Sequence, residues 1–177
     1  MANRSKKVIL SARIDPSLKA GIELAAASQK EKIVAFLEYC IQGGLSTLVI
    51  ADPFGKERGK QTAFSLFHSS VWSEDEVVYK LRVGYLGPDY APLDLVDAAA
   101  VVNSEKCFSG DYDLYGDLNG NVKKLDLIAP NVRVNIDKIK REWKLILEYV
   151  EFKKKNIHLN VDYEKYLELA YERNIPL

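Results

Sequence analysis

The amino-acid sequence predicts a mostly helical α+β protein with two parts. Between residues 8 and 45, a short alternation of apolar and polar residues is followed by two helix patterns. Beyond residue 61, long apolar stripes of helical spacing alternate with less regular stretches. The chain of 177 residues has room for both parts. We therefore predict a module of one strand and two helices over 1–45, a linker over 46–60, and a mainly α-helical domain with a few short strands over 61–177.

The first module begins with a strand over residues 8–14, where side chains alternate on a period of two. Asp15 and Pro16 then form a helix-start signal, with an N-cap acceptor followed by proline at the first helical position. The first helix has its apolar face at Leu18, Ile22, Ala25 and Ala26. The second helix, which we expect Gly43 and Gly44 to end, has its apolar face at Ile33, Phe36, Leu37, Cys40 and Ile41. We expect Cys40 to be buried and reduced.

This module is too small to stand alone. A lone strand needs a partner, and roughly 45 residues bury little core. Both needs are met if two chains pair their strands antiparallel and interleave their helices, so we expect a homodimer. Alternation then directs Leu10, Ala12 and Ile14 onto the helices and Ile9, Ser11 and Arg13 away from them.

Ten residues carry a resemblance to a known family. The strand and first turn match at Ser11, Arg13, Ile14, Pro16 and Leu18, and the helices match at Ile22, Ala26, Phe36, Leu37 and Ile41. On these residues the stretch resembles the ribbon-helix-helix family of bacterial, archaeal and plasmid DNA-binding proteins. It departs from the family at Lys30 and Lys32, where members often have a turn glycine and a capping serine.

The resemblance implies a dimer that inserts a two-stranded ribbon into the major groove of double-stranded DNA, where such a ribbon fits. Ile9, Ser11 and Arg13 would meet base edges, and Arg4, Lys6, Lys7 and Lys32 would hold phosphates. The alternative for Ser11 and Arg13 is that they only solvate the exposed face of a strand. For Ile9 the alternatives are contact with a thymine methyl or burial by the second domain. The function implied is a transcriptional repressor, or a plasmid or mobile-element DNA-processing accessory, with higher oligomers on DNA as an open possibility.

The distribution of charge agrees with a nucleic-acid footprint at the N-terminus. The formal net charge is zero, but residues 1–45 hold seven Lys and Arg against four acidic residues. The remainder is correspondingly acidic, and a dimer doubles the positive charge on one surface.

In the second part we expect helices from Ser73 to Tyr85, over 92–102, over 136–155 and over 161–173. Residues 104–134 are the least regular, with short strands over 122–128 and 132–134. The basic stretch 56–60 lacks the spacing of a phosphate-binding loop and reads as a solvated linker.

The sequence does not indicate an enzyme, a cofactor or a metal site. Asp111, Asp113 and Asp117 are spaced carboxylates, but position twelve from Asp111 is Val122, where a calcium loop needs glutamate. His68 and His158 belong to no catalytic motif, and we expect His68 to be a packed or capping residue. Cys40 and Cys107 have no spacing suited to zinc.

No stretch is long and apolar enough for a bilayer, and no signal peptide is evident, so we expect a cytoplasmic protein with no membrane contact. A function of another class also remains open: an antitoxin or defence-system accessory. Such a protein would use the N-terminal module mainly to dimerise and the C-terminal domain to bind a protein partner.

Overall fold

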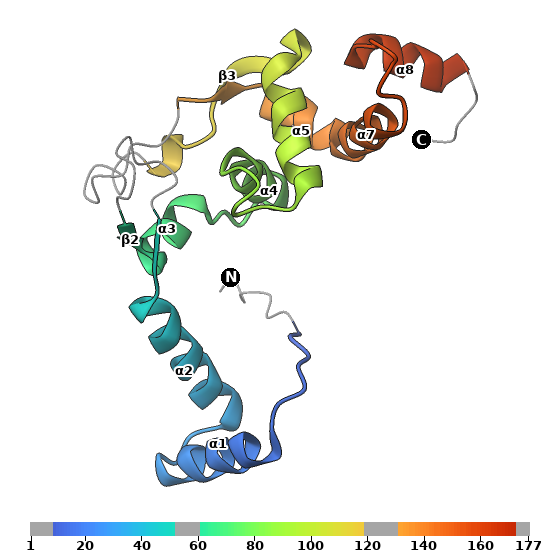
Figure 1. Ribbon diagram of the computed structural model, residues 1–177. Coiled ribbons are helices and arrows are strands. Elements are labelled where there is room, and N and C mark those ends of the chain that lie inside the picture. The colour runs from blue at the N-terminus through green and yellow to red at the C-terminus, as the bar shows by residue number, and fades with distance from the viewer. Residues whose placement is uncertain (1–8, 52–60, 119–130, 173–177) are drawn as a thin grey trace, which may run out of the picture. The chain divides into compact units, whose positions relative to one another are not determined.

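The computed structural model describes residues 9–51, 61–118 and 131–172, and the fold is mostly helical, as the sequence predicts (Figure 1). The chain divides into two compact units, Met1–Leu48 and Val49–Leu177. Arg4, Lys6 and Lys7, most of the predicted linker and the predicted strand over 122–128 lie outside the described residues.

The first unit contains α1 (Pro16–Ser28) and α2 (Ile33–Thr47). α1 begins as predicted, with Asp15 as its N-cap and Pro16 in its first turn. The prediction that Gly43 and Gly44 end α2 is wrong, because the helix runs through both to Thr47. Neither glycine has a positive φ, and a glycine inside a helix costs only about 1 kcal/mol.

The two helices are joined by a Schellman motif with lysine at its left-handed position. The N–H of Glu31 donates to the carbonyl of Ala26 at 3.0 Å, and that of Lys30 donates to the carbonyl of Ala27 at 3.1 Å. Lys30 has φ 57°, a region that glycine adopts without strain. Lys30 is the position at which the resembled family often has glycine.

Replacing Lys30 with glycine is expected to stabilise the first unit by about 1 kcal/mol, because the left-handed conformation penalises a side chain. The gain is measured as a shift in the urea midpoint of this unit. Lys30→Ala is the control, since it removes the same charge and keeps the Cβ. Equal stabilisation by both variants would show that charge, and not the backbone, is the cause.

Residues 9–15, which include most of the predicted strand, form no regular secondary structure in the single chain. Leu10 and Ile14, predicted to lie on the helices, are exposed. A strand of this length needs a partner to supply its ladder of hydrogen bonds. The single chain supplies none among its described residues.

The second unit begins with an antiparallel pair, β1 (Val49–Ala51) and β2 (Gln61–Ala63), in which Ile50 lies opposite Thr62. β1 falls in the stretch that we interpreted as a linker, so this stretch belongs in part to the second unit. The Tyr90 hydroxyl donates to the Ala51 carbonyl at 2.8 Å. α3 (Phe64–Val71), which the sequence did not predict, follows β2 directly.

The core of this unit lies between α4 (Glu76–Tyr85), α5 (Leu93–Ser104) and α7 (Ile136–Lys155), and Figure 1 shows α4 and α5 next to each other. Glycine at position 84 allows this approach, since a Cβ there would lie 2.2 Å from the Leu95 carbonyl oxygen. The largest fully buried apolar side chains of the core are Tyr115, Tyr149, Tyr163, Phe108 and Leu81.

The sequence predicted Ser73 as the cap of α4, which is wrong by two residues. Its N-cap is Asp75, whose Oδ1 accepts from the N–H groups of Val77 and Val78, both at 3.1 Å. Ser73 instead accepts from the Asp75 N–H at 3.2 Å. Asp75 Oδ2 also pairs with Lys140 Nζ of α7 at 2.5 Å. Partial burial acts to raise the pKa of Asp75, but the Lys140 hydrogen bond and the two N–H donors together lower it.

A second antiparallel pair crosses the stretch that we expected to be irregular. β3 (Ser109–Asp113) pairs with β4 (Arg133–Val134), with a register shift between Ser109 and Tyr112. The short helical turns η1 (Lys106–Phe108) and η2 (Gly116–Leu118) flank β3. α7 spans the predicted residues, and α8 (Tyr163–Glu172) completes the unit. In the part of the chain that the structure describes, every helix is too short or too polar to cross a membrane.

Arg82 anchors β3 and η2 to α4 from a fully buried position. Its Nε donates to the Leu114 carbonyl at 2.8 Å, and its Nη1 donates to the Trp72 carbonyl at 3.0 Å. Nη2 forms an ion pair with Asp117, and the guanidinium carbon lies 5.5 Å from the centre of the Tyr115 ring. This side chain therefore satisfies two backbone carbonyls from segments far apart in sequence.

Candidate functional sites

The residues predicted to meet base edges lie in the extended segment before α1. Ile9, Ser11 and Arg13 are all exposed, with Ile9 at 95%. Within the described part of the chain, no hydrogen bond or ion pair engages the side chains of Ser11 and Arg13. All three side chains are therefore open to a ligand.

The cap of α1 determines where this segment joins the helix. Asp15 Oδ1 accepts from the Ser17 N–H at 2.7 Å and from the Ser17 hydroxyl at 2.6 Å. These hydrogen bonds, the hydroxyl first, lower the pKa of Asp15. Arg13 is thus two residues from a locally fixed point.

Lys32, predicted to hold a phosphate, is the N-cap residue of α2. Its side chain makes no capping hydrogen bond, and the first turn of α2 contains no acidic residue. The first N–H groups of a helix have no partner inside it and carry partial positive charge. Lys32 therefore adds a cation next to exposed backbone donors.

The apolar faces of the first unit are open in the single chain. Ala26 is its one buried residue among those that the structure describes, and α2 contributes none. The prediction that Cys40 is buried is wrong: its side chain is exposed on α2, a helix with no buried residue. The large apolar side chains left exposed on α1 and α2 are Leu18, Leu24, Ile33, Val34, Tyr39, Ile41 and Leu45.

Two of the three aspartates considered for a metal site have structural partners for their side chains, and Asp111 in β3 accepts from Arg133 Nη1 at 3.2 Å through its main-chain carbonyl. Asp113 Oδ1 accepts from the Tyr115 N–H at 3.1 Å, and Asp117 pairs with Arg82. Among the described residues, no group of three or more His, Cys, Asp and Glu side chains could hold a metal ion.

His68 lies on α3 in a row of rings. It is exposed, and its ring stacks on those of Phe64 and Trp72 with both pairs of centres 5.9 Å apart. Trp72 is itself 53% exposed. This spacing of four residues on one helix face was visible in the sequence, but the helix was not predicted, so the row was missed.

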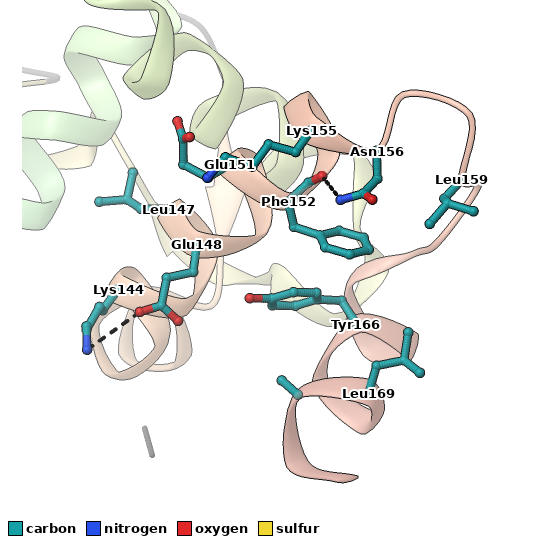
Figure 2. Close-up of a pocket in the computed structure, with 11 residues that line it drawn as sticks. Lys144, Leu147, Glu148, Glu151, Phe152, Lys155, Asn156, Leu159, Tyr166 and Leu169 are labelled. Atoms are coloured by element: carbon teal, nitrogen blue, oxygen red, sulfur yellow. Dashed lines mark hydrogen bonds and ion pairs between the residues drawn. The ribbon is translucent and has the colours of Figure 1, made fainter. Parts of the chain in front are cut away.

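A cavity of about 720 Å³ lies between the second half of α7 and α8 (Figure 2). Its apolar wall is formed by Leu147, Phe152, Leu159, Tyr166, Leu169 and Ala170, and its polar rim by Lys144, Glu148, Glu151, Lys155 and Asn156. The sequence predicted both helices but gave no indication of this groove, because a groove depends on the angle at which two helices meet.

Comparison with known proteins adds no assignment: no family model, no curated protein and no solved structure matches the chain.

Proposed function

We propose that this protein is a homodimeric, sequence-specific DNA-binding protein that inserts a two-stranded ribbon into the major groove, as a transcriptional repressor or a plasmid or mobile-element DNA-processing accessory. The observation that carries the proposal is the open first unit, where two amphipathic helices follow an extended, exposed segment and bury one side chain. A second copy would cover these faces and pair the segments into a ribbon.

In the proposed dimer each chain contributes one strand. Ser11 and Arg13 would project from it into the groove, where arginine pairs with guanine through two hydrogen bonds. Lys32 and the first backbone N–H groups of α2 would contact the phosphate backbone, with Arg4, Lys6 and Lys7 adding charge. The phosphate contacts would position the dimer, and Ser11 and Arg13 would select the sequence.

The test is fluorescence anisotropy of the full chain on pooled genomic fragments and on random duplex, across a salt series. We expect a preferred fragment, with log affinity falling linearly in log salt. Sedimentation velocity on the same sample is expected to report a dimer. A dimer that binds no duplex at low salt would overturn the proposal.

One observation favours a second candidate, a protein-interaction factor such as an antitoxin or defence-system accessory. The ring row of Phe64, His68 and Trp72 leaves an aromatic surface open on α3, and aromatic side chains are enriched in protein interfaces. Co-purification of a stoichiometric partner with the full chain, lost in Trp72→Ser, would favour this candidate over DNA binding.

A further inference from the structure

The groove between α7 and α8 has the size and lining of a small-molecule site. Its volume of about 720 Å³ falls within the roughly 300–1,000 Å³ typical of ligand sites. The rings of Phe152 and Tyr166 meet in its wall, with centres 5.1 Å apart and planes tilted by 44°. Figure 2 shows the two rings facing each other, with Leu159 and Leu169 beyond them. The apolar part of a ligand would therefore contact aromatic and aliphatic side chains along the whole groove.

The rim of the groove carries two positive and two negative side chains, Lys144 and Lys155 against Glu148 and Glu151. Lys144 pairs with Glu148 at 3.5 Å, and Glu151 lies 3.9 Å from Lys154, which pairs more closely with Asp97 at 3.2 Å. Lys155 also lines the groove, and no ion pair joins it to another described residue. A ligand with one negative charge would therefore match Lys155.

Tyr166 adds a hydrogen-bond donor. Burial, and then the nearby charge of Glu148, raise the pKa of Tyr166, so its phenol keeps its proton at neutral pH. Asn156 uses its side-chain N–H to donate to the Phe152 carbonyl at 2.8 Å, and this bond fixes the end of α7 beside Lys155. In Figure 2, the side chain of Lys155 extends toward Glu151, Asn156 lies beside Phe152, and Lys144 and Glu148 lie at the other end of the groove.

We propose that this groove binds a small amphipathic monocarboxylate, with its apolar body against Phe152, Tyr166 and Leu169 and its carboxylate paired with Lys155. The acids of the rim, Glu148 and Glu151, disfavour a second negative charge on the ligand. The inference concerns the unit Val49–Leu177 alone and does not depend on DNA binding.

Calorimetric titration of the full chain with octanoate, octanol and octylamine tests this assignment. Octanoate is expected to bind most tightly. Lys155→Glu is expected to lower the affinity for octanoate about three- to tenfold, the scale of one exposed charge contact. The affinity for octanol is expected to stay unchanged. Leu169→Asp is expected to abolish binding of both octanoate and octanol, because it places a charge against the apolar body.

The matched control is Lys153→Glu, which makes the same charge change two residues away. Lys153 does not line the groove, and its Nζ lies 5.4 Å from the centre of the Tyr149 ring. The Lys153→Glu variant is expected to bind octanoate with the wild-type affinity. Lys155 is exposed, so Lys155→Glu is expected to retain the wild-type melting temperature, which keeps the test valid even if Leu169→Asp fails to fold.

Three results would overturn the proposal: no heat of binding with octanoate, equal affinity for all three compounds, or equal loss in Lys153→Glu and Lys155→Glu. A fourth would assign the groove to a protein. If octanoate gives no heat of binding and Leu159→Asp changes the sedimentation coefficient, the groove contacts another chain instead.

Discussion

Alanine at position 13 is expected to remove the preference for a specific DNA fragment while leaving binding to random duplex largely intact. Arg13 is exposed in the segment before α1, and in the proposed ribbon each of two copies would contact a base edge. One bidentate contact contributes about 1–3 kcal/mol of discrimination, so two would contribute roughly 2–6 kcal/mol. The measurement is the ratio of affinities for preferred fragment and random duplex, by anisotropy at fixed salt.

Two control variants separate base recognition from charge. Lys19→Ala removes one positive charge from the same unit, on the face of α1 where Lys19 pairs with Glu23 at 2.6 Å, and is expected to keep the preference. Lys6→Ala combined with Lys7→Ala is expected to weaken binding to all duplexes and to reduce the salt slope. Unchanged preference in Arg13→Ala would refute the ribbon assignment.

Arg82→Met is expected to destabilise the second unit by about 2–4 kcal/mol, because one buried and one partly buried carbonyl lose their donors together and an unsatisfied buried group costs about 1–3 kcal/mol. The acceptors are the carbonyls of Leu114 and Trp72. Methionine keeps much of the volume of the arginine side chain, so the loss of stability comes from the missing hydrogen bonds more than from a cavity. The measurement is the free energy of unfolding in urea.

Asp117→Asn is the matched control on the same anchor. Asp117 is more than half exposed, so solvent screens its ion pair with Arg82, and we expect a loss of less than about 1 kcal/mol. If Asp117→Asn destabilises as much as Arg82→Met, the ion pair holds the anchor and the two carbonyl bonds do not. If neither variant has an effect, the anchor contributes nothing to stability.

The sequence predicted those elements whose signals are local. α1 has a capping aspartate and a first-turn proline, and α7 has an apolar stripe over 20 residues, so both starts could be read directly. α3 has only eight residues and no side-chain cap, and it was missed. β3 was missed because Asp and Gly, which favour turns, make up three of its five residues.

The candidate sites also differ in whether their signal in the sequence is local. Ser11, Arg13 and Lys32 could be chosen from alternation and from a resemblance, because their roles depend on a short local pattern. The groove could not be predicted, since it joins residues of α7 to residues of α8 through the loop between them. The buried role of Arg82 was equally hidden, because both of its carbonyl acceptors lie outside its own helix.

The open apolar faces of the first unit have a consequence for how the protein works in a cell. Among its described residues this unit buries only Ala26, so it gains little free energy by folding as a monomer. If a second copy supplies the rest, folding of this unit is a bimolecular step, and its extent obeys mass action. The amount of the chain made by the cell would then set the fraction competent to bind DNA, with a sharp rise once the chain concentration exceeds the dissociation constant of the dimer.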